Sequence, residues 1–317
     1  MNGENYMVSV ICTAYNHEKY IRKCLDGIVG QKTDFKIEAI IHDDASTDTT
    51  ADIIREYEAR FPKIIKPIYQ KENQYSKGID IYTFLLPHIS GKYVALCEGD
   101  DYWSSPKKLQ LQVDMLENYP DSSFATHIVR GVDESGAITN VLYPSFSMET
   151  SAIPKVEFLS IVSKQYAFQT SSFVFKSESY LEFLRNPPEF VRICPIRDIP
   201  MMLYFGYVGD VCFINQEMSC YRMSSDGSWT QRHNSLTEFR VNHYRAMSSM
   251  VEQYRAFTQN QFPEFYDNLY RRWYNQLWFH RDFKEVLKKQ YNQFFKMEPF
   301  KDRVYALLSA FFPKVFK

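Results

Sequence analysis

The chain has 317 residues, a formal net charge of −1 and 45% hydrophobic residues, which suits one large globular domain or a domain with an appendage. The near-balanced charge gives no electrostatic reason to expect a nucleic-acid partner. The six cysteines are scattered and form no CxxC pair, so we predict neither a zinc site nor a disulfide framework. A reduced cytosolic setting is expected instead. We expect no signal peptide and no transmembrane helix, because the N-terminus lacks a basic and apolar leader and no apolar run could span a bilayer.

The first predicted element is a nearly all-apolar strand at residues 7–12, followed by the turn Thr13-Ala14-Tyr15-Asn16-His17 and by helical spacing at residues 18–29. This order begins an α/β unit, in which ligands bind at the C-terminal ends of strands. Tyr15 is therefore a candidate to lie against a planar base, with backbone groups near Thr13 touching the same ligand. The alternative for Tyr15 is an ordinary packed loop aromatic. No GxGxxG follows the strand and no GxxxxGK[ST] occurs, which argues against dinucleotide and P-loop sites.

A second strand is predicted at residues 35–41, and it leads into the adjacent acids Asp43 and Asp44. Either Thr47 or Asp48 can cap the helix expected at residues 50–60. Two neighbouring carboxylates at a strand end are costly if they are buried without partners. A carboxylate there can accept a hydrogen bond from the imide of uracil or from a ribose.

The densest acidic cluster follows a predicted buried strand at residues 93–97 and consists of Glu98, Asp100 and Asp101. Glu98 and Asp100 are two positions apart, so on an extended segment they point the same way. Gly99 between them would let a ligand approach the backbone. Oxygen ligands with open positions suit Mg²⁺ or Mn²⁺ carrying a diphosphate. The alternative is a polar turn without function.

The remaining predicted elements lie between residues 64 and 218. We expect strands at residues 64–69, 122–129 and 173–175, a hairpin around residues 134–136, and a strand pair at residues 208–218. Helices are expected at residues 79–87, 104–119 and 156–163, and a helical apolar run at residues 201–205.

Three motifs in order resemble glycosyltransferase family 2, whose members have the GT-A, nucleotide-diphospho-sugar-binding fold, a Rossmann-like mixed sheet flanked by helices. In this sequence Thr13 stands where the family's first turn usually has Pro, and Glu98 replaces the first Asp of the usual Asp-x-Asp metal motif. The resemblance covers roughly residues 7–230, and a longer run resembles a bacterial polysaccharide-assembly subgroup. The family resemblance rests on Thr13-Ala14-Tyr15-Asn16, Asp43-Asp44-Ala45-Ser46-Thr47-Asp48 and Glu98-Gly99-Asp100-Asp101-Tyr102-Trp103. The subgroup resemblance rests on the last of these motifs with Pro106, Lys108 and Gln112.

The resemblance implies a metal-dependent, inverting hexosyl- or N-acetylhexosaminyl-transferase that uses a UDP-sugar and a glycan acceptor. Asp44 would contact uracil, and Glu98 would reach the ribose or the metal. Asp100 would ligate the metal directly, and Asp101 would orient the sugar or its neighbours.

Three further positions complete the implied site. Asp198 matches the family's general base, which accepts the proton of the acceptor hydroxyl, although it also suits a helix N-cap. Arg222 would pair with the diphosphate or form a structural ion pair. Trp229, on a loop that contains Gly227, would close over the donor.

Residues 231–317 are predicted to form a helical C-terminal region after a catalytic domain at residues 1–230, whose nucleotide-sugar half ends near residue 103. Residues 300–317 have an amphipathic pattern, which predicts either a helix in a membrane interface or a helix packed on protein. A membrane contact would suit a lipid-linked acceptor and a peripheral position at the inner face of the membrane. The sequence leaves a homo-oligomer open.

The sequence is compatible with two other functions. A sugar nucleotidyltransferase would also use paired acids and a metal, but the chain lacks an evident glycine-rich, basic triphosphate loop near Thr13. A non-catalytic glycan-binding protein on the same fold is the second alternative, and the acids Asp44, Asp100 and Asp198 argue against it.

Overall fold

The computed structural model describes residues 5–165, 168–223 and 237–312, which form two compact units. The described part of the first unit comprises residues 5–158, 168–187 and 205–223, and that of the second comprises residues 159–165, 188–204 and 237–312. Each unit is built from segments that are distant in the sequence.

The described strands form one ten-stranded sheet in the first unit, and its central path has the order β3-β2-β1-β4-β9-β6-β10-β5. Neighbouring strands from β3 to β4 are parallel, whereas β9 is antiparallel to both β4 and β6. The strands are β1 Val8–Ala14, β2 Ile37–Asp43, β3 Ile65–Tyr69, β4 Tyr93–Leu96, β5 Tyr102–Trp103, β6 Ser122–Val132, β7 Ile138–Tyr143, β8 Ser151–Ile153, β9 Val174–Lys176 and β10 Asp210–Arg222.

The order of β1 to β4 creates a topological switch point. The chain moves outward from β1 to β2 and β3, and then returns to place β4 on the other side of β1. Ligands in open α/β sheets bind outside the C-terminal ends of strands at such a point. Here the point lies between the turn after β1 and the turn after β4.

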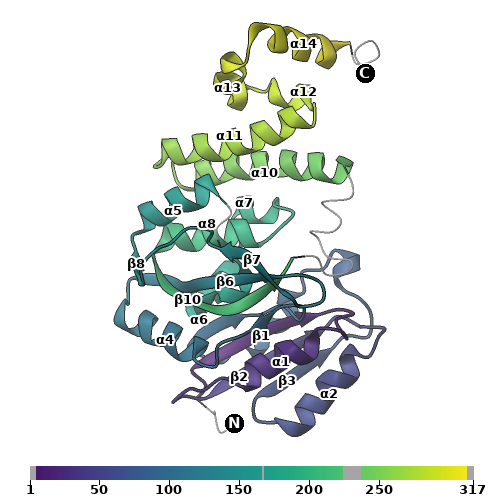
Figure 1. Cartoon of the computed structure of the whole chain (residues 1–317), viewed down its shortest axis with the longest axis vertical. Coiled ribbons are helices and arrows are strands. Elements are labelled where there is room, and N and C mark those ends of the chain that lie inside the picture. The colour runs from purple at the N-terminus through teal and green to yellow at the C-terminus, as the bar shows by residue number, and fades with distance from the viewer. Residues whose placement is uncertain (1–4, 166–167, 224–236, 313–317) are drawn as a thin grey trace. The chain divides into compact units, whose positions relative to one another are not determined.

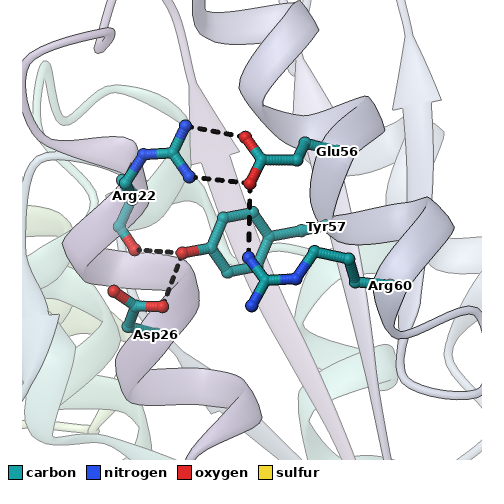
Figure 2. A network of polar contacts seen from close by, with 5 residues as sticks. All are labelled: Arg22, Asp26, Glu56, Tyr57 and Arg60. Carbon is teal, nitrogen blue, oxygen red and sulfur yellow. Dashed lines mark hydrogen bonds and ion pairs between the residues drawn. The ribbon is translucent and has the colours of Figure 1, made fainter.

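Helices α1 (Ile21–Val29) and α2 (Thr50–Arg60) follow β1 and β2, and side chains clamp them together. Figure 2 shows the network: Glu56 accepts two hydrogen bonds from Arg22, at 3.0 and 2.8 Å, and one from Arg60. The hydroxyl of the buried Tyr57 donates to Asp26 at 2.5 Å. The helices that leave the first two turns are therefore fixed to each other.

Two of the next helices are shorter or begin later than the sequence predicts, whereas α5 and α8 extend beyond the ranges expected at residues 156–163 and 201–205. The helix expected at residues 79–87 is only α3 with a 3-10 turn after it, and the one expected from residue 104 begins at Lys108 because β5 and Pro106 precede it. The expected strand pair at residues 208–218 is wrong: β10 is one strand that continues to Arg222, with register shifts against β6. These helices are α3 Tyr82–Leu85, α4 Lys108–Asn118, α5 Lys155–Lys164, α6 Ser177–Arg185, α7 Glu189–Arg192 and α8 Asp198–Val208.

The second unit is helical and rich in buried aromatic side chains. Helices α10 and α11 run side by side (Figure 1), and the buried Tyr254 on α10 donates a hydrogen bond to the carbonyl of Leu203 at 3.0 Å. No helix among the described residues combines the length and apolar character that crossing a membrane requires. The C-terminal helices are α10 Thr237–Phe257, α11 Pro263–Phe279, α12 Phe283–Val286, α13 Asn292–Met297 and α14 Phe300–Phe311.

Candidate active site

The turns after β2 and β4 are both hydrogen-bonded to the end of β1. The N–H of Asp44 donates to the carbonyl of Ala14, and the N–H of Gly99 donates to the carbonyl of Thr13, each at 2.9 Å. Adjacent carbonyls of β1 thus hold the two acidic turns next to each other. The structure therefore places Thr13, Asp44 and the Glu98–Asp101 turn beside one another, although they are far apart in sequence.

The turns after β1 and β2 also bind each other through side chains. Asn16 accepts a hydrogen bond from the N–H of Thr47 at 2.8 Å, and the Asn16 N–H donates to the hydroxyl of Ser46 at 2.9 Å. The N-cap residue of α2 is Thr49, so neither of the two expected caps, Thr47 and Asp48, holds that position. Asp48, one residue earlier, still accepts a hydrogen bond from the N–H of Thr50 at 2.9 Å. Beside this rigid pair of turns, Tyr15 is 44% exposed and available to a ligand.

Asp43 and Asp44 are both buried, and each has partners that the sequence did not indicate. Asp43 accepts from the hydroxyl of Ser46 at 2.5 Å. The two carboxylate oxygens of Asp44 accept from the N–H groups of Gln74 and Tyr75 at 2.8 and 3.0 Å. Because each carboxylate oxygen has further lone pairs, these bonds orient Asp44 without using up its capacity as an acceptor.

Gly99 serves packing between turns rather than the approach of a ligand. A Cβ atom there would lie 2.8 Å from Nδ1 of His17, 3.0 Å from Cδ1 of Ile21 and 3.1 Å from Cβ of Ala14. The space that the absent side chain leaves is therefore filled by the first turn and α1. This corrects the expectation that Gly99 opens the backbone to a ligand.

The three acids of the β4 turn have different environments. Glu98 and Asp100 are half-buried, and the hydroxyl of Thr170 donates to Oε2 of Glu98 at 2.9 Å. Asp101 is 3% exposed and accepts from the N–H of Arg222 at 2.8 Å. Burial, together with the negative charges of Asp100 and Glu98, raises the pKa of Asp101 well above its usual range.

The guanidinium of Arg222 has structural contacts inside this unit. It donates to the carbonyls of Asp100, Asp133 and Glu134 at 2.7 to 3.0 Å. It also lies 4.2 Å from the ring centroid of Tyr20 and is 5% exposed. Arg222 thus ties the end of β10 to the acidic turn, and a contact with donor phosphates stays a prediction.

Buried side chains next to the acidic turn bind the segment at residues 170–172. Trp103 donates its indole N–H to the carbonyl of Ser171 at 3.0 Å, and Gln112 donates to the carbonyl of Ser172 at 2.7 Å. The ammonium of Lys108 lies 4.2 Å from the centroid of the Trp103 ring. These contacts fix the turn that contains Thr170, and hence the partner of Glu98.

An open pocket of about 570 Å³ adjoins the acidic turn through Arg222. This volume is in the range of ligand pockets. Its lining comes from the start of α1, the β6–β7 turn and the end of β10: Lys19, Tyr20, Lys23, Asp133, Glu134, Ser135, Gly136 and Arg222.

Two expected site residues are not placed with the acidic turn. Asp198 is the first residue of α8 and accepts from the N–H of Ile199 at 2.8 Å, but it belongs to the second unit. Trp229 lies outside the described residues. The roles of both stay predictions.

The amides of Gln74 and Tyr75 were missed from the sequence, as was the role of Trp103 and Gln112 in holding the turn that contains Thr170. The loop at residues 70–78 shows only polar composition, so no signal marks which acid it contacts. The spacing of Lys108 and Gln112 does place both on one side of a helix, but nothing in the sequence shows that this side faces residues 171 and 172.

The acidic turn fits a divalent cation. Carboxylate oxygens are ligands that Mg²⁺ and Mn²⁺ accept. A cation would offset the negative charges of Asp100 and Glu98, which add to the effect of burial in raising the pKa of Asp101. Among the described residues, no group of three or more His, Cys, Asp or Glu side chains could hold an ion alone. A site with one or two carboxylates and substrate phosphates is a usual arrangement for Mg²⁺.

The sheet order, the switch point and the acidic turn define a nucleotide-diphospho-sugar transferase of the GT-A class. The model of the family "Glycosyl transferase family 2" matches residues 9–173, which is half of the chain. The chain belongs to glycosyltransferase family 2. This membership decides against the nucleotidyltransferase alternative.

Two curated relatives are similar in sequence. An uncharacterized protein of Mycobacterium tuberculosis is 32% identical over 247 residues, which cover 77% of this chain and 67% of the relative. The putative teichuronic acid biosynthesis glycosyltransferase TuaG of Bacillus subtilis is 34% identical over 128 residues, which cover 40% of this chain and 49% of TuaG. The family therefore includes relatives named for polysaccharide biosynthesis.

Two solved structures share the fold at low identity. Residues 1–349 of S. aureus TarS in complex with UDP-GlcNAc match with a TM-score of 0.61 and 17% identity, over 96% of this chain and 81% of that one. The mannosyltransferase PcManGT from Pyrobaculum calidifontis in complex with GDP-Man and Mn²⁺ matches with a TM-score of 0.51 and 15% identity, over 98% and 88%.

Proposed function

We propose that this protein is a metal-dependent, inverting glycosyltransferase that moves a hexosyl or N-acetylhexosaminyl group from a UDP-sugar to a saccharide acceptor in surface polysaccharide assembly. The observation that carries the proposal is the attachment of both acidic turns to adjacent carbonyls of β1, those of Thr13 and Ala14. This brings to one edge of the sheet the carboxylates to which the proposal assigns uracil and the metal, Asp44 and Asp100.

The donor would lie across the switch point. Tyr15 offers an exposed ring to the base, and Asp44 offers a carboxylate that the Gln74 and Tyr75 amides hold in place. Asp100, with Glu98, would hold Mn²⁺ or Mg²⁺, and Asp101 would orient its neighbours. Arg222 and Trp229 complete the proposed donor site.

In the proposed reaction Asp198 accepts the proton of an acceptor hydroxyl. The hydroxyl oxygen forms a bond to C1 of the sugar from the face opposite UDP, and the bond from C1 to the diphosphate oxygen breaks. UDP leaves with that electron pair, and the configuration at C1 is inverted. When bound, a divalent cation neutralises charge on the departing diphosphate.

The identity of the donor base and of the acceptor belongs to the same proposal. TarS, with UDP-GlcNAc, favours a UDP-sugar, whereas PcManGT, with GDP-Man, is the competing example. TuaG and its teichuronic acid favour a surface polysaccharide as product. A lipid-linked acceptor, a cytoplasmic position beside the membrane and a homo-oligomer are further parts of the proposal.

The metal role is tested by Asp100→Asn with isothermal titration of UDP in the presence of Mn²⁺. Loss of a direct metal ligand should weaken binding by about tenfold or more, while affinity without the metal stays unchanged. Asp34→Asn, an exposed acid in the same unit, is the matched control and should bind like the wild type. Equal affinity of Asp100→Asn and the wild type with Mn²⁺ would remove Asp100 from the metal site.

A further inference from the structure

Helix α14 packs on the second unit with its small side chains and turns its large apolar side chains outward. Ala306 is fully buried and Ala310 is 7% exposed. The apolar residues on the other side, together with Phe312 just after the helix end, are between 37% and 75% exposed: Phe300, Val304, Leu307, Leu308, Phe311 and Phe312. Their spacing puts them along one side of a helix, and we call this set the α14 apolar face.

Contacts of Tyr305, which is itself 37% exposed, help to hold α14 in this orientation. The Tyr305 ring lies 5.7 Å from the Phe283 ring in an edge-to-face arrangement, and Arg281 donates to the Tyr305 hydroxyl at 3.4 Å. The usual burial preference, large apolar side chains inward, is therefore reversed. A contiguous exposed apolar surface of this kind marks an interaction site.

The charges around the apolar face fit an anionic surface. Lys301 lies one helical repeat from Leu308 and Arg303 one turn from Leu307, so cations border the face on both sides. Asp302 lies on the opposite side of the helix. Residues 296–317 contain five Lys or Arg against two acidic residues, in a chain of net charge −1.

We infer that α14 is an anchor that lies in the plane of a membrane with anionic lipids, with its apolar face among the acyl chains and Lys301 and Arg303 at the headgroups. A helix with an apolar side, basic borders and phenylalanines has this mode of binding. Its 12 residues extend about 18 Å, which suits lying in the interface. The inference names the helix and the kind of lipid for the membrane contact of the proposed function. It holds whether or not the protein transfers a sugar.

The test is sedimentation of the full chain with vesicles of phosphatidylcholine, alone or with about 30% phosphatidylglycerol. The wild type should bind the anionic vesicles, and Leu307→Gln with Phe311→Gln should weaken this binding by about tenfold or more. Ile138→Gln with Val156→Gln, which changes two exposed apolar residues elsewhere, is the control and should bind like the wild type. Lys301→Gln with Arg303→Gln should reduce the preference for anionic vesicles.

Three results would overturn the inference. The wild type could stay in solution with anionic vesicles, or the Leu307/Phe311 variant could bind as well as the wild type. Alternatively, sedimentation velocity could show a dimer that this variant loses, which would assign the face to a second copy. Unchanged UDP binding by the variant in the presence of Mn²⁺ verifies its folding and separates this result from a failure of the proposed catalytic site.

Discussion

Two equally buried aspartates of this protein have different environments, because their hydrogen-bond donors and neighbouring charges differ. Asp44 and Asp101 are each 3% exposed. Asp44 accepts from two backbone N–H groups of one loop, whereas Asp101 accepts from one N–H and faces two other carboxylates. Burial and these neighbouring charges raise the pKa of Asp101 in the folded state, so its turn gains from a nearby cation.

The proposed base can be separated from a mere helix cap. Asp198→Asn keeps the size and a hydrogen-bond acceptor for the N–H of Ile199 but cannot take a proton. We expect transfer to fall by about 10²- to 10⁴-fold with UDP affinity unchanged, measured by product formation and by titration. Glu264→Gln, an exposed acid of the same unit, should leave both values unchanged. Near-normal transfer by Asp198→Asn would assign Asp198 to the cap alone.

Lys108 makes folding stability depend on pH. Burial lowers the pKa of its ammonium to about 7, against about 10.4 in the unfolded chain. Below about pH 7 Lys108 is protonated in both the folded and the unfolded protein. The folded state then bears the whole free-energy cost of burying its charge. Between these pKa values the unfolded state binds more protons, so the free energy of unfolding rises with pH.

Urea unfolding of Lys108→Met between about pH 6 and pH 9 measures this effect. The stability of the wild type relative to the variant should increase over that range by about 3 kcal/mol. The exposed neighbour Lys107 provides the control Lys107→Met, which should follow the wild type at every pH. Parallel curves for wild type and Lys108→Met would contradict a lowered pKa.

At the scale of elements, the turns after the strands pack against each other. The β4 turn touches the first turn and α1 through Gly99, where a Cβ atom would lie 2.8 Å from His17. We expect Gly99→Ala to lower the free energy of unfolding by about 1 to 3 kcal/mol and to weaken UDP binding by moving the acids. Chemical unfolding and titration of UDP with Mn²⁺ measure the two effects.

Gly78→Ala is the control for the effect of a glycine-to-alanine change on backbone conformation alone, without a packing contact. Gly78 has a φ of +73°, and a Cβ atom added there would have no neighbouring atom within 4 Å. Alanine at this position should therefore cost about 1 kcal/mol without changing UDP affinity. If Gly99→Ala behaved like Gly78→Ala, packing between the turns would not position the acidic cluster.

Strand and helix positions could be predicted where periodicity was clean. The helix expected at residues 50–60 is α2 without a shift, and the strands expected at residues 7–12 and 93–97 are β1 and β4 with shifts of at most two residues. The pair predicted at residues 208–218 failed because the register shifts of β10 between Ile214 and Ser219 interrupt the alternation that identifies one strand.

At the scale of the whole molecule, the sheet brings together segments that are more than 100 residues apart. Pairing of Trp103 with Ser219 and of Tyr102 with Cys220 places Arg222 beside Asp101. The antiparallel β9 brings the turn that contains Thr170 against Glu98. The candidate site therefore depends on the pairing of β5 with β10 and of β4 with β9 in the first unit.

A donor that binds this assembled edge should stabilise the native protein. At about 100 times its dissociation constant, a nucleotide-sugar with Mn²⁺ adds about 2.7 kcal/mol and should raise the melting temperature by several degrees. A thermal-shift screen of UDP- and GDP-sugars identifies the base, and excess EDTA should remove the shift. A screen with no shift for any nucleotide-sugar would contradict the proposed donor site.

The sequence by itself determined the order of turn motifs and the acids within them, because strand periodicity and local spacing are properties of neighbouring residues. It therefore supported the family and the GT-A fold, which the comparisons confirm. Only the tertiary structure decided that Thr13 and Ala14 join the two acidic turns, that Arg222 supports Asp101, and that α14 turns its large apolar side chains outward. Those facts depend on strand register and helix rotation, which distant segments set through packing and which local sequence does not encode.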